Sequence, residues 1–162
     1  MKEYNPHAVL MLGEYPGRSM ITIERVAINY DDSTRYGLSD EAGYAPQGTP
    51  IVQDGPAAYF TTLPLRRIIR DLRASGIPSD ISGDAGTLMC NHLMYGVLHE
   101  VVSNTNANNA NTKNGTGKNR SIPVGWIHLE NLGMPSMTAE LSCKAVECVI
   151  ASIVASEREV WI

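Results

Sequence analysis

The sequence lacks the features that mark several classes of protein. It has three cysteines, at positions 90, 143 and 148, and an odd number does not suggest a secreted disulfide framework. Its net charge is −4 and it has no stripe of Lys and Arg, so we expect no nucleic-acid partner. No apolar run approaches the roughly 20 residues of a membrane span, and the first residues do not resemble a signal peptide. The composition therefore predicts a cytoplasmic protein with no membrane partner.

The residues that are present predict one α/β domain over 1–162. Apolar runs rich in β-branched residues predict strands over 8–12, 21–28, 77–82 and 124–129. Helical patterns alternate with them, over 63–76, from Thr87 onward, and after Ser136 or Thr138. This alternation predicts a three-layer fold, in which an open, largely parallel sheet carries helices on both faces.

Cap residues and apolar spacing suggest which side of each helix is buried. The first helix should have Thr62 as N-cap, Pro64 as its first residue and Gly76 just past its end. The second should have Thr87 as N-cap. The expected core positions are Leu65, Ile68, Ile69 and Leu72 in the first helix, Met89, Leu93, Met94, Val97, Leu98 and Val101 in the second, and Leu141, Ala145, Val149, Ile150, Ile153 and Val154 in the third.

Two polar stretches should lie outside the core. Residues 31–55 are rich in Gly, Pro and Asp and predict a long surface loop. Residues 104–119 are an Asn-rich segment of low complexity with almost nothing to bury, which predicts a flexible insert.

Cys90 falls in the first turn of the second predicted helix. The unpaired N–H groups and positive dipole end of a helix N-terminus favour a thiolate there and could hold an oxyanion. Free cysteines are nonetheless often packed as small inert hydrophobes. The position alone leaves both readings open.

His128 and Glu24 are candidate partners for Cys90. His128 follows an apolar strand near its carboxyl end, where helix N-termini also point in open α/β sheets, although a histidine in such a place is more often a satisfied core residue. Glu24 interrupts the apolar run 21–28, and a buried carboxylate must be paired. Its partner could be a histidine N–H, or Arg25 or another cation. A metal site of Cys90, His92, Cys143 and Cys148 is not supported, because the sequence contains no paired C-x-x-C or H-x-x-x-H unit.

Longer blocks of sequence carry a family resemblance. GRSMITIERVAIN (17–29), DGPAAYFTTLPLRRIIRDLRASGIPSDIS (54–82), AGTLMCNHLMYGVLHE (85–100), GWIHL (125–129) and PSM (135–137) closely resemble pyroglutamyl peptidase type I, in the same order along the chain. This family consists of cytoplasmic cysteine peptidases that remove N-terminal pyroglutamate from peptides. The GPAAYF-T-LP and AGT-x-x-CNH-x-x-YG blocks are long and specific.

The resemblance implies a Cys-His-Glu triad. The nucleophile is the cysteine of CNH, here Cys90; the base is the histidine of the G-aromatic-IH strand, here His128; the orienting carboxylate is the glutamate of ERVAIN, here Glu24. It further implies acyl transfer to the thiol, an apolar pocket for the neutral lactam, and no metal or cofactor. As weaker substrate-binding candidates it suggests Arg35, near the position of a family arginine, and Glu14, which replaces a glutamine in the family's GQ-x-x-GR turn.

The resemblance also has a gap. Family members begin with a further strand, a GF-x-PF loop and a helix, and the matching region of this sequence starts beyond them. The phenylalanine-bearing loop would form one wall of the lactam pocket, and the single phenylalanine here is Phe60. This leaves an alternative function, a truncated or degenerate homologue with little activity that acts as a folded or partner-binding protein. An uncovered sheet edge would also favour a homo-oligomer.

Overall fold

A mixed four-stranded sheet is the centre of the computed structural model, which describes residues 6–15, 18–111, 122–130 and 137–156. The strand order is β1-β6-β2-β5. Strands β1 and β6 run parallel, as do β2 and β5, whereas β2 and β6 are antiparallel. The open sheet is therefore mostly parallel, as predicted. The strand bounds are Val9–Tyr15 for β1, Ile21–Glu24 for β2, Ser79–Ser82 for β5 and Val124–Glu130 for β6.

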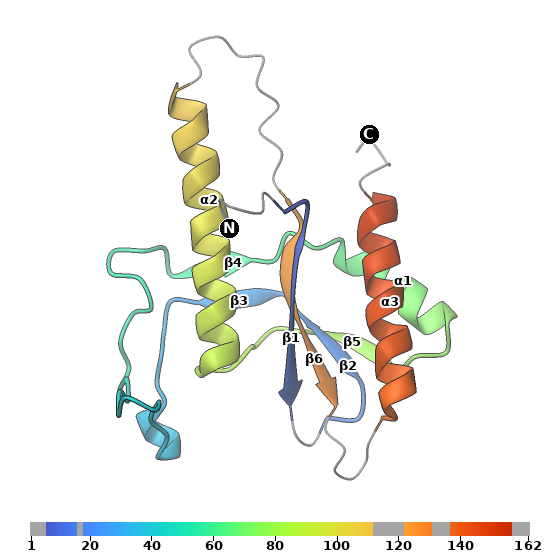
Figure 1. Cartoon of the computed structure of the whole chain (residues 1–162), viewed down its shortest axis with the longest axis horizontal. Coiled ribbons are helices and arrows are strands. Elements are labelled where there is room, and N and C mark those ends of the chain that lie inside the picture. The colour runs from blue at the N-terminus through green and yellow to red at the C-terminus, as the bar shows by residue number, and fades with distance from the viewer. Residues whose placement is uncertain (1–5, 16–17, 112–121, 131–136, 157–162) are drawn as a thin grey trace.

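Helices cover both faces of this sheet (Figure 1), which confirms the three-layer prediction. Helices α1 (Leu65–Ala74) and α3 (Ala139–Ser156) lie on one face, and α2 (Met89–Asn111) lies on the other. Because side chains alternate along a strand, each face has its own core. Ile23 and Ile127 pack in the core under α1 and α3, whereas Met11 and Trp126 pack in the core under α2.

The predicted strand 21–28 is in fact two strands. Strand β2 ends at Glu24, and β3 (Val26–Ile28) forms a separate antiparallel pair with β4 (Ala58–Phe60). Between these two strands the backbone of Arg25 makes one hydrogen bond to each neighbour: its N–H donates to the carbonyl of Ser82, and its carbonyl accepts from the N–H of Thr61. The chain thus leaves the main sheet directly after Glu24 and continues beneath α2.

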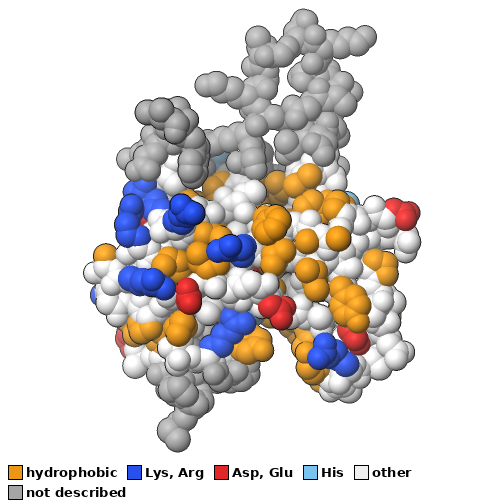
Figure 2. Space-filling view, turned by 180° about the vertical axis from the view of Figure 1, so that it is seen from behind, with side chains coloured by type: hydrophobic (Ala, Val, Ile, Leu, Met, Phe, Trp, Pro, Cys, Tyr) orange, Lys and Arg blue, Asp and Glu red, His pale blue; other side chains and the backbone are white. Residues whose placement is uncertain are grey.

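Helix α1 has the predicted apolar face, with Ile68, Ile69 and Leu72 buried. Its outer side carries arginines, and Figure 2 shows basic side chains gathered over the half of the rear face that holds this helix. The predicted cap is wrong, because Pro64 is the N-cap. Thr62 instead uses its hydroxyl to bond the backbone of Ile122 and Val124. Gly76 follows the helix with φ +73°, as predicted for a C-terminal glycine.

The buried side of α2 agrees with the predicted one at Met94 and Leu98 but not at Met89 and Leu93. Asn91, Met94, Tyr95 and Leu98 are buried, whereas Met89 is 79% exposed and Leu93 is 49% exposed. The helix is rotated this way because Asn91 makes three hydrogen bonds to the backbone of Ile28 and Tyr30. The helix also continues to Asn111, so the prediction of a structureless insert is wrong for residues 104–111. Residues 112–119 lie outside the described residues.

Helix α3 begins where Thr138 was expected to cap it. The Thr138 hydroxyl accepts a hydrogen bond from the N–H of Leu141 at 3.2 Å. The alternative cap, Ser136, lies outside the described residues. Ala145, Val149 and Ile153 are buried as predicted, but Ile150 and Val154 are each 48% exposed and do not belong to the core.

Residues 31–55 form mostly irregular structure, as predicted. One short 3-10 helix, η1 (Thr34–Tyr36), interrupts them, and the backbones of Asp31 and Thr49 form an isolated bridge. No helix in the described ranges combines the length and apolar content needed to cross a membrane.

Candidate active site

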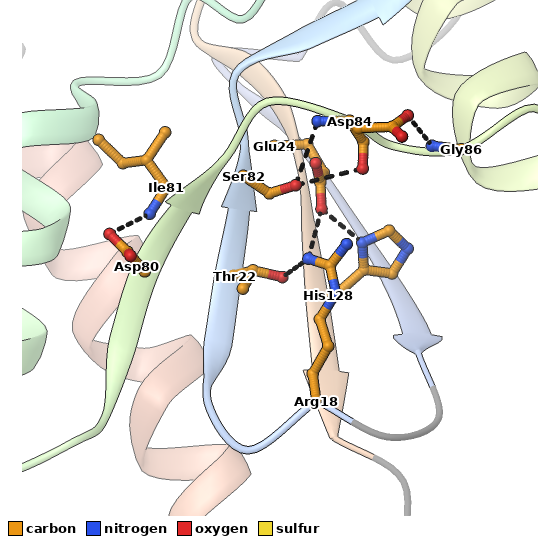
Figure 3. Close-up of polar contacts among 9 residues, drawn as sticks. All are labelled: Arg18, Thr22, Glu24, Asp80, Ile81, Ser82, Asp84, Gly86 and His128. Carbon is orange, nitrogen blue, oxygen red and sulfur yellow. Dashed lines mark hydrogen bonds and ion pairs between the residues drawn. The ribbon is translucent and has the colours of Figure 1, made fainter.

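Glu24 and His128 meet on the α2 face of the sheet (Figure 3). Glu24 is the last residue of β2, and His128 lies on β6 opposite Thr22. The pattern of alternation places Thr22 and Glu24 on the face opposite Ile21 and Ile23. Glu24 is 0% exposed and His128 is 1% exposed. His128 Nδ1 lies 2.7 Å from Glu24 Oε1. The structure therefore brings together two of the three residues of the predicted triad.

A third charged group, Arg18, completes this cluster. Its Nη1 lies 3.1 Å from Glu24 Oε1 and also donates to the hydroxyl of Thr22. Arg25, the cation considered for Glu24 from the sequence, is exposed instead. Sequence reasoning missed Arg18, although it precedes Thr22 by four residues and Glu24 by six. Arg18 precedes the first residue of β2, Ile21, so strand alternation gives no signal that could have identified it.

Two aromatic rings flank His128. The Tyr15 ring meets the imidazole edge-on, with 5.3 Å between the centroids, and the Trp126 ring lies 5.8 Å away. The guanidinium carbon of Arg18 lies 4.2 Å from the centroid of Tyr15. Trp126 itself packs against Gly13, where an added Cβ would lie 2.3 Å from Trp126 Cζ2. These close contacts fix the imidazole between the two rings.

Three buried polar atoms at this site have no hydrogen-bond partner among the described residues. They are Glu24 Oε2, Trp126 Nε1 and His128 Nε2. Since Nδ1 of His128 donates to the carboxylate, a neutral imidazole carries its lone pair on Nε2. The histidine can therefore accept a proton at Nε2 while Glu24 holds the opposite side of the ring. Buried polar atoms without partners are uncommon, and binding of a polar ligand would satisfy them.

Cys90 is the second residue of α2 and is half-buried. The turn from β5 into α2 positions the start of this helix: Ser82 and Asp84 bond each other, and the Asp84 carboxylate accepts from the N–H of Gly86 at 2.8 Å. The predicted N-cap Thr87 bonds Asp32 instead, and Leu88 accepts the first helical hydrogen bond, from His92.

The electrostatics of Cys90 differ from the expectation. Burial raises the pKa of its thiol above the ordinary value, and the negative charge of Glu24 raises it further. The backbone N–H of Cys90 and the guanidinium of Arg18 lower the pKa, but by less. The thiol is thus protonated at neutral pH. The charges of Glu24 and Arg18 both act on Cys90. Nε2 of His128, however, has no hydrogen-bond partner in the part of the chain that the structure describes, so the resting thiol does not bond the imidazole.

A pocket of about 360 Å³ lies beside the start of α2, and none of Glu24, Cys90 and His128 is among the residues that line it. Its wall includes Leu88 and Met89, directly before Cys90, and Trp126, two residues before His128. The opposite wall comes from the 31–55 loop, through side chains such as Leu38 and Tyr44. An apolar pocket of this size fits a small neutral group. Phe60 is 68% exposed and does not line the pocket.

The two weaker candidates lie away from the Glu24–His128 pair. Arg35 is exposed on η1, and its guanidinium carbon lies 4.9 Å from the ring centroid of Tyr36. Glu14 is exposed on β1 opposite Leu129, which packs against the α1–α3 core. Its side chain therefore projects from the opposite face to His128, away from the Glu24–His128 pair.

The remaining histidines have other surroundings. His92 Nδ1 lies 2.6 Å from Asp31 Oδ2, and His99 Nδ1 lies 2.9 Å from the hydroxyl of Tyr59. Among the described residues, no group of three or more His, Cys, Asp or Glu side chains could hold a metal ion.

Comparison with known proteins gives these contacts a family context. The family model described as pyroglutamyl peptidase matches residues 1–158. The pyrrolidone-carboxylate peptidase of Mycobacterium marinum is 44% identical over 164 residues, which cover 95% of this chain and 66% of that protein. That of Mycobacterium tuberculosis (strain H37Rv) is 44% identical over 167 residues, covering 97% of this chain and 68% of the relative. The chain thus spans about two thirds of the length of these relatives.

Solved structures agree with the sequence comparison. The crystal structure of pyroglutamyl peptidase I from Bacillus amyloliquefaciens superposes with a TM-score of 0.80 at 31% identity, covering 99% of this chain and 72% of that chain. No comparison favours the alternative of a degenerate homologue. The family model matches nearly the whole sequence, and the solved structures have the same mostly parallel architecture. The chain therefore belongs to the pyroglutamyl peptidase family.

Proposed function

We propose that this chain is a cysteine exopeptidase that hydrolyses N-terminal pyroglutamate (5-oxoproline) from peptides. The observation that carries the proposal is the buried Glu24–His128 hydrogen bond of 2.7 Å, with Nε2 of the imidazole left without a partner among the described residues. The helix that starts at Met89 and bears Cys90 covers the same face of the sheet. Base, orienting carboxylate and nucleophile therefore share one side of the molecule.

The reaction would proceed by acyl transfer. His128 accepts the thiol proton at Nε2 as the Cys90 sulfur attacks the carbonyl carbon that joins pyroglutamate to the next residue. The tetrahedral oxyanion is held by free N–H groups in the first turn of α2. Collapse breaks the C–N bond, and the imidazolium gives its proton to the departing amine. Water, activated by His128, then hydrolyses the thioester and releases pyroglutamate and the free thiol.

Glu24 acts on the base rather than on the substrate. By accepting from Nδ1, it fixes the tautomer that leaves Nε2 free and stabilises the imidazolium formed during the reaction. This role is needed because the Cys90 thiol has a raised pKa and does not ionise unaided at neutral pH. The site therefore fits a general-base mechanism.

The pocket beside Met89 and Trp126 is the proposed place for the lactam ring. The ring is neutral and has no free amine, so a largely apolar wall suits it. The unpartnered N–H of Trp126 could donate to one of its oxygens.

Hydrolysis of a pyroglutamyl amide with a fluorescent leaving group tests the function. Release of the fluorophore should require Cys90 and His128, and a prolyl amide, which has a charged ring nitrogen, should not be cleaved. The Cys90→Ser and His128→Ala variants should each lose activity while retaining the wild-type circular dichroism spectrum. Equal cleavage by wild type and Cys90→Ser would refute the proposal.

We also propose that the protein is cytoplasmic and self-associates. All three cysteines are free thiols, which suits a reducing compartment. Strand β1 pairs on one side with β6 and has no strand on its other side within the described ranges, and Leu12 on it is 45% exposed. Sedimentation at several concentrations tests the association, and a single monomeric species would contradict it.

A further inference from the structure

Arg18 shares one carboxylate oxygen with the proposed base. Its Nη1 lies 3.1 Å from Glu24 Oε1, the atom that also accepts from His128 Nδ1 at 2.7 Å. Figure 3 shows the guanidinium and the imidazole approaching Glu24 from two sides. Two donors therefore fix one oxygen, and rotation of the carboxylate would break both contacts.

Arg18 is itself held in place. It donates to the hydroxyl of Thr22, and its guanidinium lies over the ring of Tyr15. The side chain is 22% exposed while that of Glu24 is 0% exposed. A fully buried carboxylate such as that of Glu24 needs a compensating charge. Dissolved salt screens its ion pair with Arg18 less than it would screen a pair on the surface.

We propose that Arg18 is a positioning residue of this peptidase, which orients Glu24 toward His128 and offsets the negative charge of Glu24 at the Cys90 thiol. This inference rests on the proposed function. Arg18 does not contact the reacting atoms; it acts through Glu24 and through its charge.

The charge effect has a definite sign. Glu24 raises the pKa of Cys90 and Arg18 lowers it. Removal of the guanidinium charge leaves the carboxylate unopposed, so the thiol should ionise at higher pH and form a thiolate less readily during attack. Loss of the second donor should also loosen the carboxylate that orients the imidazole.

The test compares Arg18→Gln, which removes the charge, with Arg18→Lys, which keeps it. Arg25→Gln is the matched control, because Arg25 adjoins Glu24 in the sequence but is exposed. Two readouts are needed: the pH dependence of Cys90 alkylation by iodoacetamide, followed by mass mapping, and kcat/KM on the pyroglutamyl amide. Alkylation requires no substrate, so it reports on Arg18 even if the proposed function fails.

For Arg18→Gln we expect the alkylation midpoint to rise by on the order of half a pH unit and kcat/KM to fall about tenfold or more. Arg18→Lys should keep the wild-type alkylation midpoint, because the positive charge remains. Its kcat should be only part of the wild-type value, because an ammonium lacks the planar, forked donors of a guanidinium. Arg25→Gln should match wild type in both. An unchanged midpoint in folded Arg18→Gln overturns the inference. If that variant does not fold, Arg18→Lys decides: a retained midpoint with reduced kcat supports the inference, and wild-type kcat overturns it.

Discussion

Replacement of Glu24 by glutamine should separate the reactivity of the thiol from catalysis. Glutamine has nearly the same shape and can still present an oxygen to His128 Nδ1, but it carries no charge. Because the Glu24 charge raises the pKa of Cys90, its removal should lower that pKa. The thiol of Glu24→Gln should therefore be alkylated at lower pH than that of wild type. Catalysis should nevertheless fall.

The expected size of the loss follows from the contacts. A charge-assisted hydrogen bond such as the 2.7 Å contact between Glu24 and His128 contributes about 1.5–3 kcal/mol. Without the carboxylate, the imidazolium loses its counter-charge and the ring can adopt the other tautomer. General acid–base catalysis contributes about a hundredfold to ten-thousandfold, so we expect kcat to fall within this range. Arg18 also loses its charged partner, and we expect the free energy of unfolding to fall by about 2–4 kcal/mol.

The assay measures three quantities on one preparation: the alkylation midpoint of Cys90, kcat on the pyroglutamyl amide, and the urea midpoint of unfolding. Glu14→Gln is the control, since this carboxylate is exposed on the opposite face of the sheet and should change none of them. A Glu24→Gln variant with full activity would refute the orienting role. An upward shift of its alkylation midpoint would refute the electrostatic argument.

Three further predictions concern the surroundings of the site. Gly13→Ala should destabilise by about 1–3 kcal/mol in urea unfolding and reduce kcat, because its Cβ would lie 2.3 Å from the Trp126 ring, whereas Gly83→Ala, with nothing within 4 Å, should do neither. Trp126→Phe should lower the urea midpoint, because it shrinks a side chain buried in the core under α2, and raise KM roughly three- to tenfold, because it removes one donor to the lactam; an unchanged KM would exclude that donor. The pKa of Cys90 is higher in the folded chain than its ordinary value of 9.0, which applies to the unfolded chain. The folded protein therefore keeps the full stability that this shift contributes below pH 9.0 and loses it as the pH rises above 9.0 and through the folded pKa. Urea titrations at pH 7 and above pH 9 should show wild type losing more stability than Cys90→Ser, and parallel losses would contradict the shift.

Glu24 and His128 could be identified from the sequence because each breaks a local rule. A carboxylate within an apolar strand must have a partner, and a histidine at the end of another apolar strand can supply one. Their meeting depends on the pairing of β2 with β6, which is antiparallel in a mostly parallel sheet. Periodicity identifies strands but not the order or direction of their pairing, so the contact stayed a prediction until the topology was known.

The errors arose where one polar contact outweighed hydropathy. The apolar spacing of α2 allows two neighbouring faces to be buried, and the face with Met89 and Leu93 reads as the more hydrophobic. The hydrogen bonds of Asn91 to the backbone of β3 and Tyr30 select the other face. Similarly, the run 21–28 reads as one strand, but backbone bonds at Arg25 divide it. Such long-range contacts have no local signature in the sequence.

The charges at the site cancel both before and after proton transfer. In the proposed mechanism the Arg18 guanidinium and the Glu24 carboxylate oppose each other at rest, and the reaction starts from a neutral imidazole and a neutral thiol. When the thiol gives its proton to the imidazole, a second pair of opposite charges forms and the sum stays at zero, which suits a substrate that brings no charge of its own.

This balance makes a prediction for the pair of variants. Arg18→Gln leaves an excess negative charge and should move the Cys90 alkylation midpoint up, whereas Glu24→Gln leaves an excess positive charge and should move it down. The double variant should return the midpoint close to that of wild type, because both charges are gone. Its kcat should nevertheless remain as low as in Glu24→Gln, because His128 still lacks its orienting carboxylate. A double variant with a midpoint as far shifted as either single variant would show that the two residues do not act through their charges.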